Sequence, residues 1–140
     1  MVMRSVYLAD DDIDDIELFQ VALEEVCDSC TLTSSKDGID LLKKLSALNA
    51  LPEVVFIDVN MPMMNGKEAL LKIRQMDRYQ KIPVVLFTTS STEFDRNFAT
   101  RYNAGFVTKP LDNRQMKNIT DQFIEHCTDE VKRHIRKTYS

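Results

Sequence analysis

Short apolar runs alternate with longer amphipathic stretches along the 140 residues of this chain. The runs are rich in β-branched side chains and are bounded by polar or turn-forming residues, which predicts strands. We expect five strands, over residues 5–9, 31–35, 53–58, 83–89 and 105–108. After each run, apolar residues recur every three or four positions, which predicts a helix. These positions are Ile13, Ile16, Phe19, Leu23 and Val26; Leu41, Leu45 and Leu48; Ala69, Ile73 and Met76; Phe94, Phe98 and Tyr102; and Met116, Ile119, Phe123 and Cys127.

The regular alternation of strand and helix predicts an α/β fold, in which a mostly parallel sheet is covered by helices on both faces. Uninterrupted apolar runs at 54–57 and 84–87 suit the centre of that sheet. The chain is 44% hydrophobic and 29% charged, and it is long enough for one domain but too short for two ordinary ones. We expect this domain over residues 1–127 and a tail over 128–140 that extends the last helix.

Charge is distributed unevenly along the chain. Residues 1–28 hold nine acidic side chains and one arginine, a net charge of −8, whereas the remainder carries +4. This gives no support to nucleic-acid binding, which needs clustered Lys and Arg. No apolar run approaches the length of a membrane span, and the N-terminus turns acidic where a signal peptide would stay apolar, so we expect a cytoplasmic protein without membrane contact.

Polar residues gather where the expected strands end. They are Asp10, Asp11 and Asp12 after the first strand, Asp58 in the third, Thr88 and Thr89 in the fourth, and Lys109 after the fifth. In an open parallel sheet the ligand site lies outside the carboxyl ends of the strands, so these residues should meet at one edge. Oxygen ligands without His or Cys favour Mg²⁺ or Mn²⁺ over zinc. We expect Asp12, Asp14 and Asp15 to begin the first helix, where carboxylates suit the helix dipole, and not to bind metal.

The residues at this edge resemble the receiver domain of two-component response regulators. "ADDD" after the first strand, "FIDVNMPMMNG" around the third, "PVVLFTTSS" in the fourth and "FVTKP" in the fifth follow the order and spacing of that family, over about residues 4–127. The resemblance implies a CheY-like protein of the stand-alone type. It also implies a doubly wound sheet with the flavodoxin-like strand order 2-1-3-4-5.

The same resemblance implies a reaction and the residues that carry it out. Asp58 would be the phosphoacceptor, attacking a phosphohistidine of a sensor histidine kinase or phosphotransfer protein and becoming an aspartyl phosphate. Asp10, Asp11 and Asp58, with the backbone carbonyl of Asn60, would bind Mg²⁺, or Mn²⁺ in its place. The cation would lower the repulsion between Asp58 and the incoming phosphoryl group.

Further residues match the positions that contact or respond to the phosphoryl group in this family. Thr88 would donate to a phosphoryl oxygen, the Lys109 ammonium would pair with the phosphate, and the Lys109–Pro110 peptide would be cis. Phe106 occupies the aromatic switch position and would swing inward as Thr88 moves; without a hydroxyl it has no polar reason to stay outside. Receivers usually have Gly-Ala just before the fifth strand, where this chain has Tyr-Asn, and Asn103 can form the left-handed turn.

We therefore expect a phosphorylation switch and not an enzyme, with at most weak self-phosphorylation and self-dephosphorylation. Phosphorylation would alter the face made by the fourth helix, fifth strand and fifth helix, and this face would bind an unidentified protein or a second copy of the chain. The alternative is a phosphohydrolase of the haloacid dehalogenase type, with Asp10 as nucleophile in an Asp-x-Asp pattern. That alternative leaves "DVNMP" unexplained.

The sequence "CDSC", from Cys27 to Cys30, has the spacing of a redox or zinc motif. A reactive pair usually lies at a helix N-terminus, whereas this pair follows the first helix. Zinc needs four ligands, and the nearest further donors, His126 and Cys127, are adjacent on a helix and diverge. We expect buried or partly buried thiols that are reduced and free of metal, consistent with an odd number of cysteines in a reducing compartment.

Overall fold

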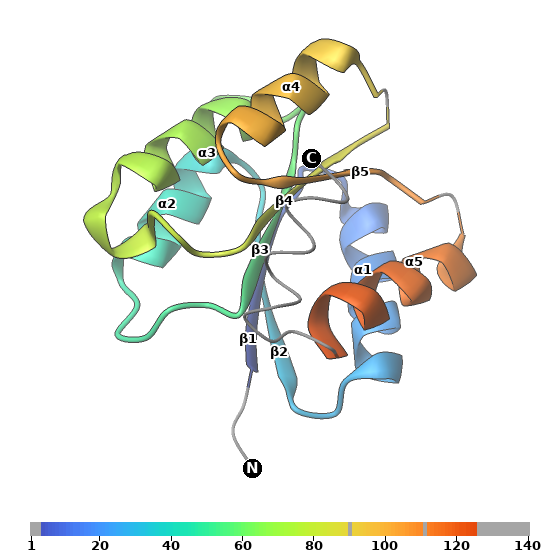
Figure 1. Cartoon of the computed structure of the whole chain (residues 1–140). Coiled ribbons are helices and arrows are strands. Elements are labelled where there is room, and N and C mark those ends of the chain that lie inside the picture. The colour runs from blue at the N-terminus through green and yellow to red at the C-terminus, as the bar shows by residue number, and fades with distance from the viewer. Residues whose placement is uncertain (1–3, 90, 111, 126–140) are drawn as a thin grey trace.

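Five parallel strands form one sheet in the order β2-β1-β3-β4-β5, with helices on both faces (Figure 1). The structure, a computed structural model, describes residues 4–89, 91–110 and 112–125. The strands are β1 (Arg4–Ala9), β2 (Cys30–Ser35), β3 (Val54–Asp58), β4 (Val84–Thr88) and β5 (Gly105–Thr108). Each agrees with its predicted range to within one residue at either end, so the predicted fold class and strand order are confirmed. The expected tail, over 128–140, lies outside the described residues.

The helices begin at the edge of the sheet where the strands end. They are α1 (Ile13–Val26), α2 (Gly38–Ser46), α3 (Gly66–Gln75), α4 (Glu93–Arg101) and α5 (Asn113–Thr120), with a 3₁₀ turn at Asp77–Tyr79 and a π-helical turn at Asp121–Glu125. Each of the five α-helices has an N-cap side chain that accepts a backbone N–H of the first turn: Asp12, Asp37, Asn65, Thr92 and Asp112. None of the helices in the described part of the chain combines the length and apolar character needed to cross a membrane.

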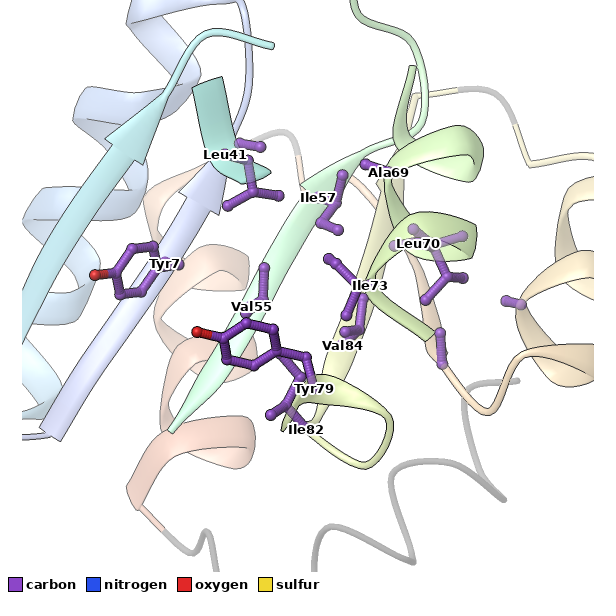
Figure 2. Close-up of a cluster of buried hydrophobic side chains, with 14 of the residues drawn as sticks. Tyr7, Leu41, Val55, Ile57, Ala69, Leu70, Ile73, Tyr79, Ile82 and Val84 are labelled. Carbon is purple, nitrogen blue, oxygen red and sulfur yellow. The ribbon is translucent and has the colours of Figure 1, made fainter. Parts of the chain in front are cut away.

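Alternate residues of the strands point to opposite faces and build two cores. Helices α2, α3 and α4 pack on one face against side chains such as Val55 and Ile57, while α1 and α5 pack on the other against Val54 and Phe56 (Figure 1). Figure 2 shows the first core, in which Ile57 of β3 and Ile73 of α3 face one another. Both faces of β3 and β4 are covered, which is why these strands read as continuous apolar runs.

Cys27 and Cys30 form a disulfide that joins the end of α1 to the start of β2. The expectation of two free thiols is therefore wrong. The place of the pair after a helix argues against reactive thiols, whereas bond formation depends on the distance between the two cysteines. The turn after α1 places the two Cα atoms 5.6 Å apart, within the range that a disulfide spans without backbone movement.

Candidate functional site

Two buried aspartates emerge side by side from the centre of the sheet. Ala9 of β1 pairs with Ile57 of β3, so the residues that follow them, Asp10 and Asp58, leave the sheet next to each other. Their side chains are almost fully buried, at 1% and 6% exposed, whereas the neighbouring Asp11 is exposed. Carboxylate oxygens of Asp10, Asp11 and Asp58 lie within 4.8 Å of one another. The acidic cluster that the sequence predicts at this edge is thus present.

The ammonium of Lys109 lies among these acids. It comes from the end of β5 and contacts Asp10 Oδ2 at 2.7 Å, Asp15 Oδ2 at 2.8 Å and Asp58 Oδ2 at 3.3 Å. The expected approach of Lys109 to Asp58 is therefore observed. The contact with Asp15 is not expected from the sequence, which predicts for Asp15 only a place at the start of a helix.

A signal for Asp15 was present in the helical spacing of α1. Asp15 lies four residues before Phe19, and Phe19, Ala22 and Leu23 are the buried residues of this helix. Residues four apart share a helix face, so Asp15 faces the sheet at the end of the helix nearest the site. Asp12 instead caps the helix, accepting the N–H of Asp14 at 2.9 Å, as the sequence predicted.

The electrostatics of the site are dominated by crowded negative charge at low solvent exposure. Burial raises the pKa of Asp10 from 3.8 to about 6, although hydrogen bonding and attraction from Lys109 lower it in part. Burial likewise raises the pKa of Asp58, against the attraction of Lys109. Burial alone would lower the pKa of Lys109, but its hydrogen bonds to Asp10 and Asp15 outweigh this and raise it. The ammonium is therefore firmly held in its charged form.

The donor set fits a hard divalent cation. The cluster offers three carboxylates, and the Lys109 ammonium contacts two of these and Asp15, so an added cation would offset the excess negative charge. Asp10 Oδ2 and Asp58 Oδ2 already attract one cation, the Lys109 ammonium. The N–H of Asn60 donates to Asp58 Oδ1 at 3.2 Å, which places this residue beside the cluster. That the backbone carbonyl of Asn60 binds the cation stays a prediction.

The loop between β3 and α3 fits closely around Asp58. A Cβ added at Gly66 would lie 2.2 Å from the backbone oxygen of Asp58, so only glycine allows α3 to start this near the strand. Met63, in the same loop and 80% exposed, has a φ of 66°, a left-handed conformation that is unfavourable for a side chain of this kind. The backbone of this loop is therefore constrained at two positions, Met63 and Gly66.

The expected switch residues lie on β4 and β5. Thr88 is fully buried at the end of β4, opposite Thr108 of β5. Phe106 is only 3% exposed and the guanidinium of Arg96 lies 5.0 Å from its ring centre, so the ring is buried. The inward swing of this ring as Thr88 moves stays a prediction. Asn103 has a φ of 57°, which confirms that it forms the left-handed turn before β5.

One expectation at this site is contradicted. The described residues, which include Lys109 and Pro110, contain no cis peptide bond. The trans form is the intrinsically preferred one, and with it the Lys109 amine already reaches Asp10 and Asp58. The cis peptide expected from the resemblance is therefore not needed to direct this amine into the site.

Comparison with known proteins agrees with this geometry. A sequence model described as "Response regulator receiver domain" matches residues 6–121. The chain is 26% identical over 125 residues to an uncharacterized 14.6 kDa protein of Leptolyngbya boryana, covering 88% of this chain and 92% of that protein. The chain spans about half the length of two other curated relatives. It covers 50% of a probable methanogenesis regulatory protein, FilR2, of Methanothrix harundinacea and 47% of a CpxR homolog of Haemophilus influenzae.

Solved structures of response regulators share the fold. The phosphorylated cyanobacterial phytochrome response regulator RcpA superposes with a TM-score of 0.81 at 25% identity, covering 92% of this chain and 96% of RcpA. The Mn²⁺-bound form of Rcp1 gives a TM-score of 0.80 at 25% identity, with coverage of 89% and 97%. A phosphohydrolase with Asp10 as nucleophile is not favoured by these matches. The chain belongs to the family of response regulator receiver domains.

Proposed function

We propose that this receiver accepts a phosphoryl group on Asp58 from a phosphohistidine, borne by a sensor histidine kinase or a phosphotransfer protein. The observation that carries the proposal is the meeting of Asp58 with its expected partners at one edge of the sheet. Its carboxylate lies within 4.8 Å of oxygens of Asp10 and Asp11 and 3.3 Å from the Lys109 ammonium. Receiver domains take phosphoryl groups from histidine kinases, and this arrangement suits that transfer.

The transfer exchanges a phosphorus–nitrogen bond for a phosphorus–oxygen bond. An oxygen of the ionised Asp58 carboxylate attacks the phosphorus, and the imidazole leaves with the bonding electron pair and takes up a proton. Lys109 favours the ionised form of Asp58, because its attraction opposes the effect of burial on the Asp58 pKa. No general base is required, because the nucleophile carries no proton.

A divalent cation fits the proposal. Mg²⁺, held by Asp10, Asp11, Asp58 and the Asn60 carbonyl, would supply positive charge against the repulsion between the carboxylates and the anionic phosphoryl group. Mn²⁺ has the same preference for oxygen ligands, and Rcp1 has been solved in a Mn²⁺-bound form. The Lys109 ammonium and the Thr88 hydroxyl would then donate hydrogen bonds to the phosphoryl oxygens.

We further propose that phosphorylation is read on the face made by α4, β5 and α5. Thr88 pairs with Thr108, so a shift of Thr88 toward a phosphoryl group is transmitted directly to β5. Phe106 on β5 packs in the core beneath α4 and lies under Arg96 of that helix. A change in β5 would therefore alter α4 and the binding of a protein partner or of a second copy of the chain. The domain acts as a switch, with at most weak self-phosphorylation and self-dephosphorylation.

The experiment that tests Asp58 uses acetyl phosphate as donor and intact mass as the measurement. With Mg²⁺ present, the unsubstituted chain should gain one phosphoryl group, and Asp58→Asn, which keeps the volume but removes the nucleophile, should gain none. Asp14→Asn is the matched control, since Asp14 is exposed in the first turn of α1. A chelator should abolish the gain, because the acids then repel the donor. Normal labelling of Asp58→Asn would show that another residue is the acceptor.

A further inference from the structure

The Lys109 ammonium has no hydrogen-bonding capacity left in this structure. A lysine ammonium offers three N–H donors, and Lys109 contacts three carboxylates. The distances to Asp10 and Asp15 are nearly equal, at 2.7 and 2.8 Å, and both are shorter than the 3.3 Å to Asp58. Asp15 is therefore as close a partner as the buried acid at the end of β1, although it comes from a helix and not from a strand.

Asp15 differs from the other two partners in its place. Asp10 and Asp58 belong to the acidic cluster that fits a metal, together with Asp11, and Asp15 is not part of that cluster. Its side chain is 32% exposed, so its charge is less costly than that of the two buried acids. Helix α1 is fixed against the sheet by Phe19, which is fully buried and lies 4.9 Å from the ring of Phe56. Asp15 thus offers a carboxylate at a fixed position beside the cluster.

A divalent cation and the ammonium compete for the same oxygens. Asp10 Oδ1 accepts the N–H of Asp12 and Asp58 Oδ1 accepts the N–H of Asn60, which leaves the Oδ2 atom of each acid as the oxygen more open to a cation. Lys109 contacts both of these Oδ2 atoms. A cation that binds there takes over at least part of the ammonium's interactions, and the ammonium needs another anion nearby if it is to stay in the site.

We propose that Asp15 is a positioning residue, which holds the Lys109 ammonium beside the site when a divalent cation occupies the carboxylates of Asp10 and Asp58. The inference rests on the proposed function, because it assumes that this cluster binds Mg²⁺. Held by Asp15, the amine leaves room for the cation and stays within reach of a phosphoryl group on Asp58. Without Asp15, the ammonium keeps to Asp10 and Asp58 and opposes metal binding.

The test is a calorimetric titration of the phosphate-free protein with Mg²⁺ alone. Asp15→Asn should raise the dissociation constant for Mg²⁺ about ten-fold more than Asp14→Asn does, the size expected for loss of one charged hydrogen bond. Asp14→Asn removes the same charge from the same helical turn, so it measures the general loss of attraction. Asp15→Glu, which restores a carboxylate, should return the constant to within about three-fold of the unsubstituted value. Thermal unfolding of each variant verifies that it is folded.

The same substitutions in a Lys109→Met variant distinguish the positioning role of Asp15 from a general effect of its negative charge on Mg²⁺ affinity. Lys109→Met keeps the length of the side chain and removes the competing cation, so Mg²⁺ should bind this variant more tightly than the unsubstituted chain. In this background Asp15→Asn and Asp14→Asn should have equal effects, because Asp15 then has no amine to hold. Equal effects of the two substitutions in the presence of Lys109 overturn the inference. An excess effect of Asp15→Asn that persists in the Lys109→Met background overturns it as well.

The two proposals fail in different ways. If the unsubstituted chain is phosphorylated on Asp58 with Mg²⁺ and Asp15→Asn behaves like Asp14→Asn, the positioning role is wrong and the proposed function stands. If the unsubstituted chain neither binds Mg²⁺ nor gains a phosphoryl group, the proposed function is wrong and the positioning role falls with it.

Discussion

Replacing Asp10 by Asn should stabilise the metal-free protein, although it removes a contact with Lys109. Asp10 is 1% exposed and lies in a cluster with two other carboxylates. Burial raises its pKa to about 6, and this value already includes the attraction of Lys109. The ionised side chain therefore destabilises the folded state at neutral pH. Asparagine has nearly the same shape, is neutral at every pH, and can still accept the N–H of Asp12 that Asp10 Oδ1 accepts at 3.0 Å.

The magnitude follows from the difference between the folded pKa of about 6 and the ordinary value of 3.8. A pKa difference of one corresponds to about 1.4 kcal/mol, so ionisation of Asp10 lowers the free energy of unfolding by about 3 kcal/mol at pH 7 and above. Because the folded pKa is the higher one, the protonated acid contributes its full stability below pH 3.8, and this is lost as the pH rises through about 6. Asp10→Asn should therefore raise the free energy of unfolding by about 3 kcal/mol at pH 7.5 and by only about 1 kcal/mol at pH 4.5.

The assay is urea denaturation at these two pH values, with a chelator present and then with excess Mg²⁺. Mg²⁺ should stabilise the unsubstituted chain by binding its folded state and should do so much less for Asp10→Asn, so the advantage of the variant shrinks or reverses. Asp11→Asn is the control: Asp11 is exposed, so its loss should change metal-free stability by less than about 0.5 kcal/mol while still weakening Mg²⁺ binding. If Asp10→Asn is no more stable than the unsubstituted chain at pH 7.5, or is stabilised equally at both pH values, ionised Asp10 does not destabilise the fold.

Three further predictions concern the loop around Asp58 and the disulfide. Gly66→Ala should lower the free energy of unfolding by about 3 kcal/mol in urea denaturation, because its Cβ would lie 2.2 Å from the Asp58 carbonyl oxygen; an unchanged midpoint would contradict this close fit. Met63→Gly should raise the free energy of unfolding by about 0.5–1 kcal/mol by relieving the φ of 66°, whereas Met63→Ala should bring no gain. Reduction of the Cys27–Cys30 disulfide should lower thermal stability by about 2 kcal/mol at most, since it closes a loop with a sequence separation of only 3. The double variant Cys27→Ser/Cys30→Ser should have the thermal stability of the reduced protein, and reductant should not change it. Full alkylation of the untreated native protein would show that the bond is absent.

The pattern of residues along the chain is enough to predict the order of strands and helices and the edge at which the polar residues meet. Hydrophobic period is a local property, so the continuous runs of β3 and β4 and the helical spacing of α1 could be recognised without tertiary information. Residues that end parallel strands must lie at one edge of the sheet, which is why the cluster of Asp10, Asp11 and Asp58 could be predicted from their positions. The order of the strands in the sheet came from the resemblance to receivers and not from the pattern itself.

Which of these groups touch depends on how the strands and helices pack together. The partnership of Asp15 with Lys109 joins residues 94 apart in the chain, and it depends on how α1 is rotated and placed on the sheet. The disulfide depends on the turn after α1, and the burial of Phe106 on the packing of α4 over β5. Such contacts are set by distances of a few ångströms between separate elements. Residue spacing along a chain fixes which face a side chain occupies, but the packing of whole elements fixes what it meets there.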